Sequence, residues 1–157
     1  VGRANQFIIP EAYLKTRLGV FEFYAGRRRE IVGLVDTTLT SGSYIWSGNA
    51  LPVPKLEISI PNYTPITKNG LISIKGNFAH GWFGNQGIVR DFYLHQKWFY
   101  TRIGRPNAKF TFYGGFNHQV QWGGYTAREK FAGGFWAFAY SVLPLKNVSE
   151  KAQGSLT

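Results

Sequence analysis

Apolar and polar residues alternate one by one along most of this chain. In the segment 71–83 they separate by parity, with Ile72, Ile74, Phe78 and Trp82 in one set and Ser73, Lys75 and Asn77 in the other. The segment 109–122 sets Phe110, Phe112, Phe116, Val120 and Trp122 against Thr111, Tyr113, Asn117, Gln119 and Gln121. Because successive side chains of a β-strand point to opposite faces, this alternation predicts strands with one face in water and the other against hydrocarbon or a core.

The pattern predicts six strands joined by connections of unequal length. We expect these strands at about 6–17, 20–27, 55–66, 71–83, 92–103 and 109–122. Short turns follow the first, third and fifth of them, and the strongest turn signal is Asn69-Gly70, since both residues tolerate positive φ. Longer links span 28–54 and 84–91 and follow Gly123. Short turns that alternate with long links are typical of transmembrane β-barrels.

The length of the strands favours the same class. A strand of a soluble protein usually has about five or six residues, whereas about 9–11 tilted residues cross a bilayer. Aromatic residues gather near the strand ends, as in Trp82-Phe83 and Trp98-Phe99-Tyr100, which is typical of barrel girdles. The sequence therefore predicts an all-β fold that is a portion of a large antiparallel transmembrane β-barrel. The alternative is a soluble β-protein with an aromatic-rich core.

The end of the chain departs from the alternation. Alanines among aromatic residues, followed by Pro144, predict a short helix in 133–145, placed in a loop or in the lumen, and a polar tail in 146–157. We treat 1–157 as a single partial barrel segment. The chain starts at Val1 and contains no Met, so we expect a processed protein or an internal piece of a longer one.

Composition excludes several classes of protein. Phe 13, Tyr 9 and Trp 5 make up 17% of the 157 residues, which argues against intrinsic disorder. The absence of Cys excludes disulfides, thiolate metal sites and Cys nucleophiles. The histidines His80, His95 and His118 lack the spacing common among metal ligands, so we expect no metal and no cofactor.

Carboxylates are scarce, with only 8 Asp and Glu residues. A glycosidase needs two carboxyl groups about 5–10 Å apart across a sugar cleft. We instead expect Glu11, Glu22 and Glu57 to pair with charges on the polar faces of their strands, and we predict that the protein is not an enzyme.

Cations outnumber anions and give a formal net charge of +10. Lys15, Arg17, Lys75 and Lys97 are expected on the polar faces of their strands, and the cluster Arg27, Arg28 and Arg29 at the start of the first long link. A basic lumen attracts anionic solutes or polymers, and a cationic rim meets lipopolysaccharide phosphates. A soluble basic domain that binds nucleic acid is the alternative. Most aromatic residues alternate with the polar ones, however, so they cannot readily form a base-stacking platform with the cations.

Several composite motifs resemble the Wzi capsule-assembly family in the form found in Bacteroidetes-type bacteria. The longest is Tyr113-Gly-Gly-Phe-Asn-His-Gln-Val-Gln-Trp-Gly-Gly124. The others are Leu94-His-Gln-Lys-Trp98, Arg102-Ile-Gly-Arg-Pro-Asn107, Ser41-Gly-Ser43, Ser47-Gly-Asn-Ala50 and Pro52-Val-Pro54. Together they span most of the segment 20–125.

This resemblance implies a bacterial outer-membrane β-barrel of about eighteen strands, a size that encloses an aqueous lumen. Better-known members act as lectins that hold capsular polysaccharide at the cell surface. Six strands cannot close such a barrel, so the chain is expected to be an internal portion of it. The expected partners are an acidic polysaccharide or lipopolysaccharide, outer-membrane lipid and other envelope proteins, with no nucleic acid.

The candidate ligand-binding residues follow from the expected inward face. They are Tyr113, Asn117, Gln119, Gln121, Lys97, His95 and Lys75, beside the surface basic cluster Arg27, Arg28 and Arg29. Tyr113 offers a flat surface for a sugar ring, and the amides offer hydrogen bonds. The alternative for the amides is a hydrogen-bonded lumen wall without a ligand. The alternative for the whole protein is an anion-selective porin-like channel or the barrel subunit of another surface assembly.

Overall fold

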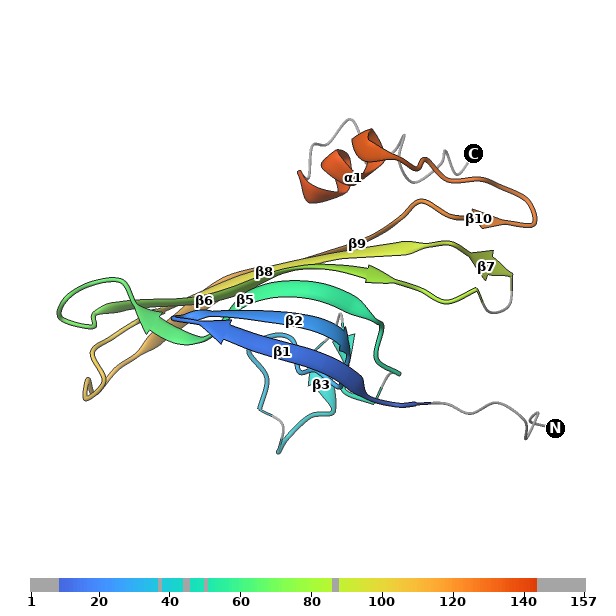
Figure 1. Ribbon diagram of the computed structural model, residues 1–157. Coiled ribbons are helices and arrows are strands. Elements are labelled where there is room, and N and C mark those ends of the chain that lie inside the picture. Colours follow the sequence, from blue (N-terminus) through green and yellow to red (C-terminus); the bar gives the residue numbers. More distant parts are fainter. Residues whose placement is uncertain (1–8, 37, 44–45, 50, 86–87, 144–157) are drawn as a thin grey trace.

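A single six-stranded antiparallel sheet dominates the structure, a computed structural model that describes residues 9–36, 38–43, 46–49, 51–85 and 88–143. The strand order is β1-β2-β5-β6-β8-β9, so neighbours in the sheet follow one another along the chain (Figure 1). The long strands are β1 Ala12–Leu18, β2 Phe21–Arg27, β5 Lys55–Pro65, β6 Ile72–Trp82, β8 Tyr93–Ile103 and β9 Phe112–Trp122. The sheet is open, with β1 and β9 as its two edges.

Five of the six expected segments contain one of the long strands, and the first, 6–17, overlaps β1, which ends one residue later at Leu18. The first is shorter than expected, because the strand starts at Ala12 and 6–8 lie outside the described residues. Four two-residue strands were not expected: β3 Gly42–Ser43, β4 Trp46–Ser47, β7 Val89–Arg90 and β10 Tyr125–Thr126. The helix α1 Phe135–Val142 lies within the expected 133–145, and the expected tail 146–157 lies outside the described residues.

Short turns and long links lie at opposite ends of the sheet. The β1–β2, β5–β6 and β8–β9 turns share one end, and the links that carry β3, β4, β7 and β10 share the other (Figure 1). Gly19 and Gly70 adopt φ of +61° and +67° in the first two turns, a region that favours glycine. We call the two ends of the sheet the turn end and the link end.

Strand pairing separates the sheet into an apolar face and a polar face. The apolar face carries large side chains such as Leu14, Phe23, Leu56, Ile58, Phe78, Phe99 and Phe116. The polar face carries Glu22, Glu57, Ser59, Asn77, Gln96, Asn117 and Gln119 in cross-strand rows. This separation agrees with the sequence pattern in β1, β2, β5, β6 and β9.

Burial is inverted relative to a water-soluble protein. Many of the buried side chains are polar, and Glu22, Lys55, Glu57, Ser59, Ser73, Asn77 and Gln96 all belong to the polar face. Large apolar side chains are exposed on the other face, with Leu14 at 76% and Phe112 at 70%. No helix within the described residues is long and apolar enough to span a membrane.

The expected position of Lys97 and His95 on the polar face is wrong. Lys97 pairs with Phe78 and His118, and His95 pairs with His80 and Val120, so both belong to the apolar face. The physical reason is that β8 carries bulky residues on both parities, so its orientation is determined by hydrogen-bond register with β6 and β9.

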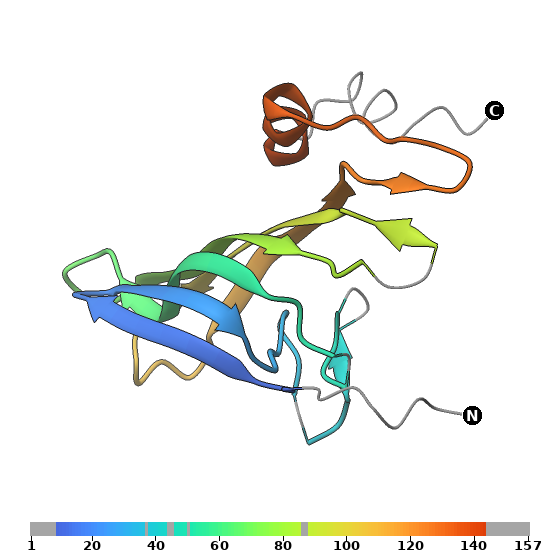
Figure 2. The ribbon, with the colours of Figure 1, turned by 45° about the vertical axis from the view of Figure 1, so that its right-hand side comes forward.

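The two faces are covered by different segments. Helix α1 lies against the apolar face, where Phe138 packs on His80, His95 and Trp122. Of the two expected places, a loop or the lumen, the structure agrees with the loop, because α1 belongs to the link after β9 and does not lie on the polar face. The link that carries β3 and β4 lies on the opposite side of the sheet (Figures 1 and 2). Its start, residues 28–33, folds back over the polar face and buries Val32.

Candidate functional site

A cavity of about 330 Å³ lies between residues 28–33 and the polar face. Its lining includes Arg28, Arg29, Glu30, Glu57, Ser59, Lys75, Trp98 and Tyr100. Strands β5, β6 and β8 supply the floor, because their alternation directs these side chains to one face. The folded-back link supplies the roof, so cations from two distant parts of the sequence meet at one cavity.

At the link end of this cavity, a buried ion network fixes the link to the sheet. The ammonium of Lys55 lies 2.6 Å from Glu30 Oε2 and 2.8 Å from Glu57 Oε2. It also donates to Gln96 Oε1 at 2.7 Å. Burial raises the pKa of Glu30 above its usual value, and the charge of Lys55 opposes this shift.

The floor of the cavity is held by an amide. Asn77 Nδ2 donates to Glu57 Oε2 at 3.1 Å, and Asn77 Oδ1 accepts from the backbone N–H of Trp98 at 3.0 Å. Both ends of the Asn77 side chain are therefore occupied. Glu57 Oε2 therefore contacts both Lys55 and Asn77, and these contacts hold its carboxylate in the wall of the cavity.

Toward the turn end, a lysine lies among three aromatic rings. Lys75 Nζ is 4.9 Å from the ring centre of Tyr63, 5.3 Å from that of Tyr100 and 5.8 Å from that of Trp98. The guanidinium of Arg102 lies 5.5 Å from the ring centre of Tyr63. These are cation–π distances, at which the rings stabilise the charges without neutralising them. Burial lowers the pKa of Lys75 below its ordinary value, whereas contact with the ring faces favours its charged form. The rings and the two cations form one surface that can meet an incoming anion.

Arg28 joins the roof to the sheet at the β2 side. Its guanidinium lies 4.4 Å from the ring centre of Tyr24 and 3.5 Å from Glu22 Oε1. Lys15 and Arg17 also contact Glu22 Oε2, at 3.5 and 3.2 Å. Three cations thus share one carboxylate, so positive charge remains in excess there. The expected pairing with cations is confirmed for Glu22 and Glu57. Glu11 lies just before β1 and instead accepts a hydrogen bond from the backbone N–H of Arg29 at 3.1 Å.

The structure brings some of the predicted site residues together. Lys75 lines the cavity, and Asn117 Oδ1 accepts from the Tyr100 hydroxyl at 2.6 Å. The ring of Tyr113 packs on Tyr63 with centres 5.5 Å apart, so it extends the aromatic group. Arg28 and Arg29 line the cavity as well.

Other predicted site residues lie elsewhere. Gln119 is on the polar face but pairs with Gln96, beside the ion network, and exposed Gln121 pairs with Leu94 at the link end. Arg27 pairs with Ala12 on the apolar-face parity, so the predicted basic cluster is split. Lys97 and His95 lie on the apolar face, as described above.

Sequence reasoning missed the residues that complete the site: Glu30, Lys55, Tyr63, Trp98, Tyr100 and Arg102. The spacing of Trp98, Tyr100 and Arg102 at every second position was an available signal, since it places all of them on one face. No local pattern reveals that Glu30 reaches Lys55, because the contact joins residues 25 positions apart.

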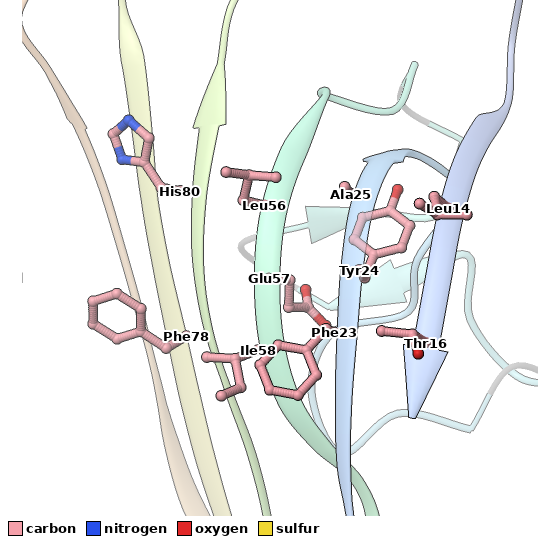
Figure 3. Close-up of a pocket in the computed structure, with 10 residues that line it drawn as sticks. All are labelled: Leu14, Thr16, Phe23, Tyr24, Ala25, Leu56, Glu57, Ile58, Phe78 and His80. Atoms are coloured by element: carbon pink, nitrogen blue, oxygen red, sulfur yellow. The ribbon is translucent and has the colours of Figure 1, made fainter. Parts of the chain in front are cut away.

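A second concavity, of about 490 Å³, lies on the apolar face between β1 and β6. Leu14, Phe23, Leu56, Ile58 and Phe78 dominate its lining, drawn in Figure 3. It offers hydrocarbon and almost no polar group, so it suits acyl chains and not a charged ligand.

The side chains that line the polar-face cavity suit the binding of an anion. Arginine and lysine hydrogen-bond carboxylates or phosphates, and tyrosine and tryptophan rings offer flat apolar surfaces with polar edges. Within the described ranges, no cluster of three or more His, Asp or Glu is placed to hold a metal ion. The arrangement favours an anionic, hydroxyl-rich ligand.

No protein-family model, curated protein or solved structure matches this chain. The resemblance to the capsule-assembly family therefore remains a prediction from the sequence motifs.

Proposed function

We propose that this chain forms a wall section of a bacterial outer-membrane β-barrel whose inward face binds an acidic surface polysaccharide without chemical change. The observation that carries this proposal is the inverted burial of the sheet. Charged and amide side chains are buried on one face, and large apolar side chains are exposed on the other. This is the arrangement that a barrel wall needs between lipid and a polar lumen.

The apolar face needs a hydrocarbon cover. Removing a large aliphatic or aromatic side chain from water contributes about 1.5–3 kcal/mol. Leu14, Leu56, Phe78, Phe99, Phe112 and Phe116 are each exposed on this face, so leaving it in water would cost many times that amount. Contiguous apolar surface of this kind marks a membrane or protein contact, and a lipid bilayer covers all of it at once.

The polar face supports an acidic polymer as ligand. Its cavity combines Arg28, Arg29 and Lys75 with Trp98 and Tyr100, and the chain as a whole carries a net charge of +10. The cations match carboxylate or phosphate groups, and the rings match sugar faces. The motifs at 94–98 and 113–124 that resemble the capsule-assembly family support a capsular polysaccharide.

Alternating labels along β5 test the membrane part of the proposal. The chain contains no Cys, so Ile58→Cys and Ser59→Cys each introduce a single reactive site in it. With a nitroxide attached and the intact protein in vesicles, we expect oxygen to reach position 58 far better than a water-soluble nickel chelate does. Position 59 should resist both reagents, because Ser59 is buried beneath residues 28–33. A position 58 that neither reagent reaches would indicate a protein core and would overturn the proposal.

Ligand binding is tested at Lys75. Hydrogen bonds to charged groups contribute about 1.5–3 kcal/mol, so Lys75→Gln should weaken retention of an acidic polysaccharide about tenfold or more. Lys68→Gln is the matched control, because it removes the same charge from an exposed position in the β5–β6 turn. Equal retention by both variants would contradict a site at the cavity.

One observation favours an anion-selective channel as a second candidate. Residues 28–33 fold over the polar face and bring Arg28 and Arg29 with them, as a constriction loop would. Single-channel conductance of the intact protein in a planar bilayer separates the two functions. An open anion-selective pore supports the channel, and polymer binding without conductance supports the lectin.

A further inference from the structure

A group of titratable side chains lies near the link end of the apolar face, on β6, β8 and β9. His80 pairs with His95 across β6 and β8, and Lys97 pairs with His118 across β8 and β9. Four such side chains on a face of leucine, isoleucine and phenylalanine would each be costly in hydrocarbon. We call His80, His95, Lys97 and His118 the polar island.

Helix α1 covers this polar island. The ring centre of Phe138 lies 5.7 Å from that of His80, 6.2 Å from that of His95 and 5.7 Å from that of Trp122. The ammonium of Lys97 donates to the backbone carbonyl of Val142 in the last turn of the helix. As a result the side chain of His95 is 0% exposed although it belongs to the apolar face.

The opposite side of α1 is also apolar. Ala137 and Ser141 are buried toward the sheet, whereas Phe135 and Trp136 are 74% and 69% exposed. The rings of Phe135 and Trp136 lie 5.7 Å apart, and those of Trp136 and Tyr140 lie 6.2 Å apart, so they form a continuous aromatic layer. The helix sequence Phe-Trp-Ala-Phe-Ala-Tyr-Ser-Val contains no charged residue. A helix that is apolar all round needs a nonpolar environment on both sides.

We propose that α1 is an interfacial lipid-binding helix on the outer wall of the barrel. It seals the polar island with one side and inserts Phe135, Trp136 and Tyr140 into the lipid surface with the other. Phe138, on the other side of the helix, joins α1 to Trp122 of β9, so the aromatic layer and the exposed apolar residues of the sheet belong to one connected packing unit. The aromatic layer lies at the link end, where tryptophan and tyrosine form the girdle of a membrane barrel. The inference rests on the proposed function, because it takes the apolar face as the lipid face.

Fluorescence quenching by lipids tests the inference. A fluorophore is attached to the intact protein through Trp136→Cys, Ile58→Cys or Ser59→Cys, and the protein is reconstituted in phospholipid vesicles. Some of the lipids carry a nitroxide, either at the headgroup or midway along the acyl chain. An interfacial helix lies about 5–10 Å into the headgroup boundary, so headgroup quenching at position 136 should exceed chain quenching about twofold. Position 58 should show the reverse, and position 59 should resist both.

The outcomes separate the inference from the proposed function. Quenching at 58 but not at 136 would overturn the lipid-binding role of α1 and leave the barrel intact; it would indicate that a protein partner covers the helix. Quenching at neither position would overturn both. Quenching at 136 but not at 58 would retain a lipid-binding helix and overturn the barrel.

A second variant tests the seal over the polar island. Lys97→Met removes the hydrogen bond to the Val142 carbonyl and keeps an unbranched side chain that is one atom shorter. We expect a nitroxide at position 136 to gain mobility in this variant while one at position 58 does not. Unchanged mobility at 136 would contradict the role of Lys97 as the anchor of α1.

Discussion

Lys55 is the residue on which the folded-back link depends. It is 3% exposed and contacts Glu30 and Glu57 at once. Lys55→Met would leave two carboxylates facing each other without a counter-charge. Breaking a buried ion pair by removing one partner costs about 3–5 kcal/mol, so we expect a loss of that size in the free energy of unfolding, measured by denaturant titration in micelles.

Two further variants serve as a control and as a rescue for the Lys55→Met measurement. Lys15→Met removes a half-exposed partner of Glu22, at 3.5 Å, and should cost about 0–1 kcal/mol. Adding Glu57→Gln to Lys55→Met should restore part of the lost stability, because one uncompensated charge is removed. A Lys55→Met protein as stable as the parent would show that the network does not hold the link.

Glu30 gives the link a dependence on pH. Burial raises its pKa above the ordinary value of 4.5 in spite of Lys55, so the folded state binds the proton more tightly than the unfolded chain. We therefore compare the free energy of unfolding of the parent with that of Glu30→Gln. The difference should grow in favour of the parent as the pH falls through the folded-state pKa of Glu30, and it should become constant below pH 4.5. Denaturant midpoints of both proteins across this range measure the difference, and a constant difference would contradict the shift.

At the scale of the strand, β9 contains two neighbouring glycines in different environments. A Cβ on Gly115 would collide with the backbone carbonyl of Phe99 and with Tyr100, its cross-strand neighbour. A Cβ on Gly114 would meet nothing within 4 Å. The pair therefore provides a substitution and its matched control one residue apart.

Gly115→Ala should push Tyr100 away from Asn117 and Lys75. We expect it to cost about 1–3 kcal/mol of stability, as overpacking does, and to weaken polysaccharide retention. Gly114→Ala should change the free energy of unfolding by no more than about 0.5 kcal/mol. Thermal unfolding and polymer retention of both variants measure these effects, and equal behaviour of the two would contradict the packing at Gly115.

A comparison of β6, β8 and β9 explains which strand faces could be predicted from the sequence and which could not. In β6 and β9 one parity is almost wholly apolar, so the faces follow directly from the alternation. In β8 each parity holds aromatic and polar side chains, such as Phe99 and Lys97 on one and Trp98 and Arg102 on the other. Only the pairing with β6 and β9 assigns the face, which is why Lys97 and His95 were misplaced and Trp98 and Tyr100 were missed.

At the scale of the whole molecule, the elements could be predicted far better than their long-range contacts. The antiparallel strands and the helix in 133–145 follow from local patterns of apolar residues. The return of residues 28–33 onto the polar face depends on Glu30 meeting Lys55, and the position of α1 depends on Phe138 meeting His80. Neither contact leaves a periodic signal in the sequence, so the roof of the cavity and the cover of the apolar face emerge only from the structure.

The two open edges of the sheet need hydrogen-bond partners from outside the sheet. Strands β1 and β9 each have one neighbour, so the outer backbone groups of both need a partner. In hydrocarbon an unsatisfied backbone group costs several kcal/mol, and a membrane sheet therefore closes on further strands. An edge strand in water would leave about half of its amides free to exchange.

Hydrogen exchange of the intact protein in its membrane measures whether the edge strand β9 is paired with a further strand. Peptides from 112–122 should exchange as slowly as peptides from 72–82, whose strand β6 has neighbours on both sides. Peptides from the turn 104–111 should exchange quickly and provide the internal control. If about half of the β9 amides exchange as fast as the turn, the edge meets water. A sheet with a water-exposed edge cannot be part of a closed wall in lipid, whatever its apolar face contacts.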